Sequence, residues 1–353
     1  MDFPSTYISS SLKDGKVEVK QIPFLKEKLT SQTIVVKPMY MGLCRADIKE
    51  VASTRDIPGD RGPLFGHEFV GEIIFSGDQT GYNQGQIVTF NPNITPKRTT
   101  GFAQYFFIEG DKDTLERTLT LYTKTTPLDP PWLSEPFACI VHCVDVLSMH
   151  LHKENYSGDK VGIIGAGNSG LMFGMMLRSL GAEVSFYNRG IVRREFAVDK
   201  GFFSKEQMKS FNSINGDKDQ YYIVVLVPTK IDQTTLQYAV DLVKENGTIL
   251  LYGGTRRGDV LEGEPQSVDI DRVRRNENYV PVTTNGKHIF ISGGYGCTRA
   301  DFEKAIALYS QHHEEFPLDK LISRVIRLED LPQLINTMAF GSVDYPGKVL
   351  ILS

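Results

Sequence analysis

The feature that most constrains this chain is a glycine pattern between an apolar strand and a helix. Residues 161–170 read VGIIGAGNSG, in which Gly165, Gly167 and Gly170 form G-x-G-x-x-G. The first glycine permits a tight turn, the second lets a pyrophosphate approach the backbone, and the third lets helix and strand pack closely. Free amides at the helix N-terminus then favour an anion. The pattern predicts a dinucleotide-binding βαβ unit; a merely tight βα turn is the alternative.

The rest of the chain predicts two different architectures. From residue 160, apolar strands alternate with helical segments, among them TLQYAVDLVKENG, which is typical of a doubly wound parallel sheet. Before it, the short β-type runs TIVVKP, GEIIF, QIVTF and QYFFI are separated by turn residues, which indicates a mostly β domain. Since 353 residues exceed what one core usually serves, we expect a first domain at 1–133, a dinucleotide-binding domain at 134–296, and a segment 297–353 that completes the first.

Charge and cysteine content exclude several classes of protein. A net charge of -4 supplies no positive field for nucleic acid or an anionic membrane. The N-terminus lacks the pattern of a signal peptide, and no apolar run is long enough to cross a bilayer. Four cysteines without a regular framework indicate reduced thiols. We therefore expect a cytoplasmic protein with a small-molecule partner, in which at least one cysteine is available as a metal ligand.

The end of the second strand of the dinucleotide unit predicts the cofactor. After Tyr187, the position that carries a carboxylate in NAD-selective sites is Asn188, and Arg189 follows it. A carboxylate would repel a 2′-phosphate, whereas Asn and Arg accept one, and Arg193 and Arg194 lie close behind. We expect NADP(H) to be favoured over NAD(H). The alternative is that these arginines form the solvated first turn of the next helix.

The first half of the chain contains a candidate metal site. GLCRAD places Cys44 near the end of a strand, and GHEFVGEI places His67 and Glu68 just before another. Cysteine, histidine and carboxylate bind zinc, and a catalytic zinc has three protein ligands and one exchangeable position. From spacing alone, a buried structural cysteine and histidine remain the alternative.

Taken in order, GLCRAD, GHEFVGEI, SEPFACIVHCVDVL and VGIIGAGNSG resemble the medium-chain zinc-dependent dehydrogenase/reductase family over nearly the whole chain. The resemblance implies an α/β protein with a GroES-like, mostly β catalytic domain and a Rossmann domain. It implies that Cys44 and His67 bind catalytic zinc, that Glu68 is a ligand or close neighbour, and that Glu135 lies at the fourth ligand position of polyol-dehydrogenase-like members.

The resemblance also assigns roles on the segment after Cys44. Asp47 matches the carboxylate that orients the zinc histidine. Arg45 matches an arginine that reaches the cofactor pyrophosphate in some members, a surface arginine being the alternative. Where the family usually has a hydroxyl and a histidine that relay the substrate proton, this chain has Ala46 and Lys49. We expect the proton to pass through water and Glu68 or Glu135, assisted by Lys49.

A second departure concerns the number of metals. Many members carry a structural zinc on a four-cysteine lobe, but residues 84–110 contain no cysteine, so one zinc per chain is expected. The absent lobe, Ala46, VKPMYMGLCRAD and GFAQYF resemble more specifically the ribulose-5-phosphate reductases, which make an alditol phosphate with NADPH.

These observations together predict an enzyme. We expect a zinc-dependent NAD(P)-dependent oxidoreductase that acts on a secondary alcohol or ketone of a polyol, cyclitol or sugar phosphate, and that forms a homodimer or homotetramer. A zinc-free quinone or enone reductase and a non-catalytic NADP(H)-binding protein are the alternatives.

Overall fold

The computed structural model describes residues 3–54, 65–94, 96–341 and 343–353. It divides into two compact units. Unit 1 comprises Met1–Ala138, Cys297–His313 and Leu318–Ser353, and unit 2 comprises Cys139–Gly296 and Glu314–Pro317. The sequence predicts domain boundaries after residues 133 and 296. This division into a catalytic domain and a dinucleotide-binding domain stays a prediction.

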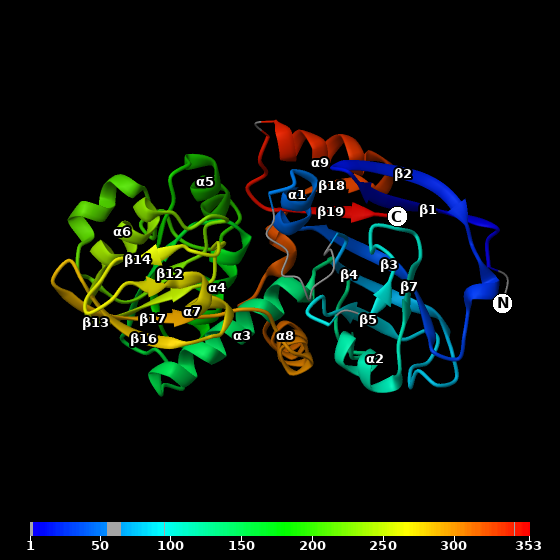
Figure 1. The fold of residues 1–353 in the computed structure, drawn as a ribbon, viewed down its shortest axis with the longest axis horizontal. Coiled ribbons are helices and arrows are strands. Elements are labelled where there is room, and N and C mark those ends of the chain that lie inside the picture. The colour runs from blue at the N-terminus through cyan, green and yellow to red at the C-terminus, as the bar shows by residue number, and fades with distance from the viewer. Residues whose placement is uncertain (1–2, 55–64, 95, 342) are drawn as a thin grey trace. The chain divides into compact units, whose positions relative to one another are not determined.

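Unit 1 is built on a largely antiparallel sheet in the order β18-β19-β3-β4-β5-β8, with β7 also pairing β3 and β6 pairing β7, and on a separate hairpin β1–β2. The last strand of the chain, β19, lies antiparallel to β3, with Val349 opposite Leu43 (Figure 1). The sheet thus brings Lys348, the first residue of β19, to the end of β3, next to Cys44. The elements of unit 1 are β1 (Thr6–Lys13), β2 (Lys16–Pro23), η1 (Lys26–Lys28), β3 (Thr33–Leu43), α1 (Arg45–Val51), β4 (Glu68–Ser76), β5 (Ile87–Phe90), β6 (Lys97–Arg98), β7 (Phe106–Glu109), α2 (Lys112–Thr118), β8 (Leu119–Leu121), α8 (Arg299–His312), η3 (Leu318–Leu321), β18 (Ile322–Arg327), η4 (Leu328–Asp330), α9 (Leu331–Phe340) and β19 (Lys348–Leu352).

Aromatic side chains fill the core of unit 1 beneath β4. The ring centroids of Phe69, Phe90 and Phe106 lie 4.7–5.8 Å apart, and all three side chains are buried. Buried rings of this size contribute both apolar area and specific ring contacts to stability. Since Phe69 directly follows Glu68, this packing fixes the start of β4.

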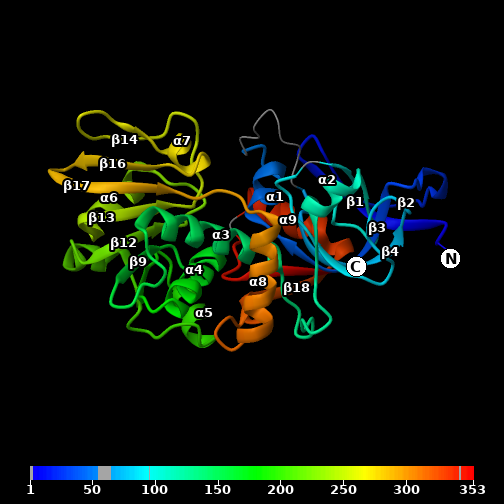
Figure 2. The same cartoon turned by 90° about the horizontal axis from the view of Figure 1, so that it is seen from below.

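Unit 2 contains a seven-stranded sheet in the order β11-β10-β9-β12-β13-β17-β16, parallel except for the edge strand β16. The chain order reverses between β9 and β12, and ligands of such sheets bind outside the carboxyl ends of the strands at that point. The short helix α7 and the β14–β15 pair lie at the β16–β17 edge (Figure 2). The elements of unit 2 are β9 (Lys160–Ile164), α4 (Asn168–Ser179), β10 (Glu183–Tyr187), α5 (Ile191–Asp199), β11 (Met208–Lys209), η2 (Phe211–Asp217), β12 (Tyr221–Leu226), α6 (Gln233–Leu242), β13 (Val243–Leu251), β14 (Val260–Leu261), β15 (Val268–Asp269), α7 (Ile270–Arg275), β16 (Tyr279–Thr284) and β17 (Lys287–Gly293).

The division between the units falls inside α3 (Ser134–Leu151), the helix expected from SEPFACIVHCVDVLSMH. Across the described ranges, no helix combines the length and the apolar character needed to span a bilayer.

One expected element boundary was wrong. The sequence pattern predicts a helix that continues through VKENG, but α6 ends at Leu242 and β13 begins at Val243. The register of β13 against β12 shifts there, from Tyr221 opposite Val243 to Ile223 opposite Thr248. Asn246 adopts φ 58°, a conformation that Asn and Gly tolerate and that no helix continues through.

The glycine pattern forms the expected tight turn from β9 into α4. Gly165 has φ 112°, which a residue with a side chain rarely adopts. A Cβ on Gly170 would lie 2.0 Å from the carbonyl oxygen of Gly165. The close approach of helix to strand therefore depends on the third glycine.

We predict that Gly170→Ala lowers the free energy of unfolding by about 1–3 kcal/mol, because the backbone of the turn must move to accept a methyl group. The measurement is urea unfolding followed by circular dichroism. Gly216→Ala is the matched control, since no atom lies within 4 Å of the position of its Cβ. Equal stability of the two variants would contradict this account of the turn.

Candidate functional site

Asp47 fixes the backbone of the segment that follows β3. Cys44 has extended backbone angles, φ -92° and ψ 155°, and precedes the first turn of α1. Its backbone N–H donates to Asp47 Oδ2 at 2.9 Å, so the carboxylate caps the helix that begins at Arg45. This contact holds the Cys44 side chain at the junction of strand and helix.

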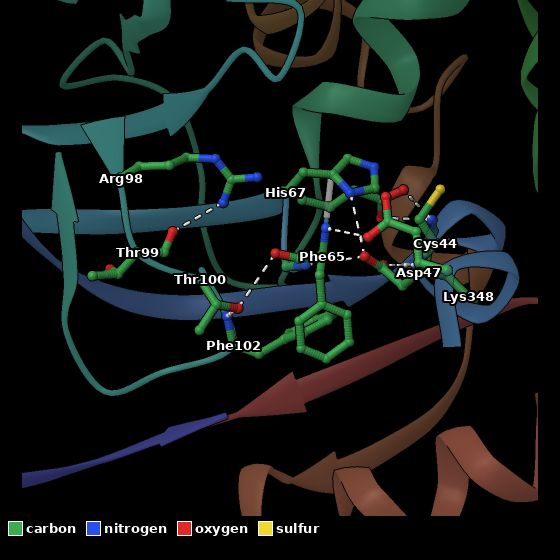
Figure 3. Close-up of polar contacts among 12 residues, drawn as sticks. Cys44, Asp47, Phe65, His67, Arg98, Thr99, Thr100, Phe102 and Lys348 are labelled. Carbon is green, nitrogen blue, oxygen red and sulfur yellow. Dashed lines mark hydrogen bonds and ion pairs between the residues drawn. The ribbon is translucent and has the colours of Figure 1, made fainter. Parts of the chain in front are cut away.

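The same carboxylate binds the segment that carries the other two metal candidates. The backbone N–H of Gly66 donates to Asp47 Oδ1 at 3.0 Å, and His67 Nδ1 lies 3.5 Å from the same oxygen. The Asp47 side chain is completely buried. Figure 3 shows Cys44, Asp47 and His67 gathered at the end of β3. Asp47 thus contacts both the backbone of Cys44 and the ring of His67, while the orienting role that the resemblance implies for the histidine stays a prediction.

Cys44, His67 and Glu68 form the candidate metal site. One ligand atom from each lies within 4.8 Å of the others, and His67 and Glu68 are buried. Ligands of a tetrahedral zinc lie about 3.3–3.8 Å apart, given bonds of roughly 2.0–2.3 Å. The donor set of one sulfur, one imidazole nitrogen and one carboxylate oxygen fits zinc, and a contraction of about 1 Å brings the donors to that spacing.

Lys348 is the residue of this site that sequence reasoning missed. Its Nζ donates to both oxygens of Glu68, at 2.8 and 2.6 Å, and the two side chains are 11% and 1% exposed. Lys348 begins β19, which the sheet places beside β3. In the sequence, Lys348 is a single lysine before an apolar run, which is typical of the start of a strand. The sequence therefore gives no indication that Lys348 pairs with Glu68.

Burial and neighbouring charges together shift the pKa values of Cys44, His67 and Glu68. Burial raises the pKa of the Cys44 thiol, and Glu68 raises it further. Burial lowers the pKa of His67, but the charges of Asp47 and Cys44 outweigh it and hold that pKa well above its usual value. Burial likewise raises the pKa of Glu68, but Lys348 and His67 outweigh it, so the carboxyl is ionised. A divalent cation would replace the protons of Cys44 and His67, since zinc binds thiolate and neutral imidazole.

Glu135, Arg45 and Lys49 are not among the three candidate ligands of this cluster. Glu135 is buried in the first turn of α3 and acts electrostatically on Lys348, but it is not in the group whose ligand atoms lie within 4.8 Å of one another. Arg45 forms an ion pair with Asp344. Lys49 is half-buried on α1, one turn after Arg45 and on the same face.

In unit 2, Asn188 supports the glycine loop. Its Oδ1 accepts a hydrogen bond from the backbone N–H of Ala166 at 3.1 Å, and its Nδ2 donates to the carbonyl of Gly190 at 2.8 Å. Both polar atoms of this buried side chain are therefore engaged by backbone. Asn188 joins the loop after β9 to the loop after β10, a role that the sequence did not reveal.

The three arginines after β10 lie in different environments. Arg189 is exposed, with its guanidinium 5.8 Å from the ring centroid of Phe211. Arg193 lies closest to the glycine loop, because its Nη1 is 3.5 Å from the position of a Cβ on Gly167. Arg194 has a buried Nε without a hydrogen-bond partner in the described part of the chain. Helix α5 thus brings the Arg193 guanidinium back to the glycine loop.

Comparison with known proteins is consistent with both halves of this description. Residues 30–114 match the alcohol dehydrogenase GroES-like domain. The chain is 25% identical to ribulose-5-phosphate reductase 1 of Staphylococcus aureus over 66% of this chain and 71% of that protein. It is 23% identical to glucose 1-dehydrogenase of Metallosphaera sedula over 93% and 94% of the two chains. Its fold matches that of a Sinorhizobium meliloti protein assigned as a zinc-binding dehydrogenase and bound to NADP, with a TM-score of 0.71, 19% identity and 99% of both chains covered.

The chain therefore resembles the medium-chain dehydrogenase/reductase family in its GroES-like domain, its curated relatives and its fold. The resemblance inferred from its motifs is confirmed, as is the expected pairing of a GroES-like domain with a Rossmann domain. The expected enzyme class, an NAD(P)-dependent dehydrogenase, is confirmed with it. The roles of individual site residues stay predictions.

We predict that Asp47→Asn lowers the free energy of unfolding by about 1.5–3 kcal/mol, because one acceptor oxygen becomes an N–H group that faces the donors of Cys44, Gly66 or His67. Chemical unfolding of the metal-free protein measures this effect. Asp113→Asn is the control, since the Asp113 side chain is 89% exposed. A cost no larger than that of the control would show that Asp47 does not hold the two segments together.

Proposed function

We propose that this dehydrogenase is zinc-dependent and transfers a hydride between NADP(H) and the secondary alcohol or ketone of a polyol, cyclitol or sugar phosphate. The observation that carries the proposal is the cluster of Cys44, His67 and Glu68 on the GroES-like domain. A sulfur, an imidazole and a carboxylate at this spacing are suited to bind one zinc ion together. The names of the relatives, a sugar-phosphate reductase and a sugar dehydrogenase, support the substrate class.

Cys44 and His67 would hold the metal directly, with Glu68 and Glu135 as direct or exchanging ligands. Bound zinc supplies a Lewis acid that polarises the carbonyl for reduction, or eases deprotonation of the alcohol for oxidation. Asp47 faces Nδ1 of His67 and so leaves Nε2 as the ligand nitrogen. Lys348 competes for both oxygens of Glu68, which favours Glu68 as the exchanging member of the set.

The proposed cofactor site uses the glycine loop and the arginines that follow β10. Gly165 and Gly170 make the tight turn into α4, Gly167 leaves the backbone open to a pyrophosphate at the start of that helix, and Arg45 is a further candidate contact. Arg189, Arg193 and Arg194 supply positive charge for a 2′-phosphate. The Sinorhizobium meliloti structure was determined with NADP, which is consistent with this choice.

The remaining expectations are part of the same proposal. With Ala46 unable to relay a proton, Glu68 or Glu135 would carry it, assisted by Lys49. One zinc per chain follows from the absence of cysteine in residues 84–110. We also propose a cytoplasmic homodimer or homotetramer. All four cysteines are free thiols, which supports a reducing compartment.

We predict one zinc per chain in the purified enzyme, measured by elemental analysis alongside activity. Cys44→Ser and His67→Ala should each lower metal content and abolish measurable turnover, because each removes a ligand that cannot be replaced locally. Cys297→Ser, a change at another free cysteine, should keep the zinc. Two zincs per chain, or full activity without metal, would refute the assignment; the second result would favour a zinc-free reductase.

We predict that kcat/KM is roughly ten- to a hundredfold higher with NADPH than with NADH, since one charge-assisted contact to the 2′-phosphate contributes about 1.5–3 kcal/mol. Combining Asn188→Asp with Arg189→Ala and Arg193→Ala should remove this preference. Lys205→Ala, a charge removed from an exposed site, should preserve it. A native preference for NADH would mean that these arginines are only a solvated helix face.

A further inference from the structure

The carboxylate of Glu68 lies across β3 in a space that only a glycine leaves open. Glu68 stands directly opposite Gly42 in the register of β4 with β3. Gly42 in turn stands opposite Leu350 of β19, two residues after Lys348. The side chain thus starts on β4, passes over Gly42 and reaches Lys348 at the beginning of β19. All three strands belong to the sheet of unit 1.

The space over Gly42 has no room for a larger residue. A Cβ on Gly42 would lie 2.4 Å from Glu68 Oε2 and 2.3 Å from Cδ1 of Leu133, far inside van der Waals contact. Leu133 is itself buried. We call this space, bounded by Gly42, Leu133 and Lys348, the Gly42 gap. It fits the Glu68 carboxylate closely and fixes where that group lies.

Lys348 holds the carboxylate in the Gly42 gap. Its Nζ donates to both Glu68 oxygens, at 2.8 and 2.6 Å. Burial lowers the pKa of Lys348, but the charge of Glu68 outweighs it and raises that pKa above its usual value, so the side chain is a cation. Removing either charge alone leaves the other buried and unpaired, which is strongly unfavourable.

The Gly42 gap lies beside the candidate metal ligands. One Glu68 oxygen is within 4.8 Å of the ligand atoms of Cys44 and His67. Since a zinc–oxygen bond is about 2.0–2.2 Å long, a displacement of about 1 Å brings this oxygen to a shared metal. Lys348 and the metal are therefore two cations that compete for the same carboxylate. The positive charge of Lys348 also repels a divalent cation bound beside it.

We propose that Lys348 and Gly42 are positioning residues that hold Glu68 away from the metal and so keep one ligand position open for the substrate. This inference rests on the proposed function and adds a control on metal affinity at the same site. A catalytic zinc needs such an exchangeable position. The opposite role is that Lys348 orients Glu68 as a permanent ligand, since carboxylate ligands are commonly hydrogen-bonded by a neighbour. The two roles predict opposite changes in zinc affinity when the charge of Lys348 is removed.

The test measures the zinc Kd of the intact protein by competition with a chelator of known affinity. Lys348→Met should lower the Kd by at least about tenfold, because Glu68 then joins the ligand set and the repulsion by the ammonium is lost. Lys348→Arg keeps the charge and should stay within about threefold of the native value. Lys37→Met is the matched control, since Lys37 is an exposed lysine of β3, and it should leave the Kd unchanged.

A double change separates the effect of the carboxylate from that of the charge. In a chain with Glu68→Gln, Lys348→Met should tighten zinc binding by no more than about threefold, because the group that Lys348 positions is gone. Cobalt(II) in place of zinc gives an independent readout, since its visible absorption depends on coordination geometry. Lys348→Met should change that spectrum, and the double variant should restore the native spectrum.

Gly42→Ala tests the gap without altering any charge. The added methyl group takes the place of the carboxylate oxygen, so Glu68 should shift to the metal and the zinc Kd should fall. Gly216→Ala is the control, since no atom lies within 4 Å of the position of its Cβ. Thermal unfolding identifies any variant that does not fold. If Lys348→Met is such a variant, Gly42→Ala decides.

The possible failures can be told apart. A higher Kd for Lys348→Met would mean that Lys348 orients a permanent ligand, and an unchanged Kd would mean that it only stabilises the fold. Either result overturns the inference and leaves the zinc site in place. If the native protein binds no zinc, the proposed function fails, and the inference fails with it.

Discussion

The candidate metal site of unit 1 depends on one buried carboxylate. Asp47 accepts hydrogen bonds from the backbone of Cys44 and Gly66 and faces the ring of His67. It thus joins the end of one strand to the start of another, about twenty residues later in the chain. In a buried environment such charge-assisted contacts are strong, and leaving their donors unpaired is costly. The positions of the sulfur and imidazole donors follow from this single group.

Charge compensation explains how the site tolerates so many ionisable groups. Glu68 would be expensive to bury alone, but Lys348 pairs with both of its oxygens. Because Lys348 begins β19, a strand more than 250 residues after Glu68 contributes a side chain to the candidate metal site. The same pairing occupies both carboxylate oxygens of Glu68, so a metal would compete with Lys348 for them.

In unit 2, positive charge is placed at two points along the carboxyl edge of the sheet. Arg193 lies over the glycine loop at the switch point, and Arg274 lies near the end of β17. The two positions differ in what holds them: a Cβ on Gly167 would make only ordinary contact with Arg193, whereas a Cβ on Gly293 would lie 2.0 Å from the carbonyl oxygen of Val273 in α7. The close packing of α7 on β17 therefore depends on Gly293.

The sequence by itself determined the fold class, the turn at Gly165 and the metal candidates Cys44 and His67, because each depends on local chemistry: strand periodicity, glycine conformation, and residue types suited to zinc. Only the tertiary structure decided that Lys348 pairs with Glu68 and that Arg193 lies over the glycine loop. Their partners are set by strand pairing and helix packing between segments distant in the chain. The sequence does not show whether a lysine or arginine side chain contacts water or a buried carboxylate. Its partner can be identified only in the tertiary structure, where the sheet brings distant segments together.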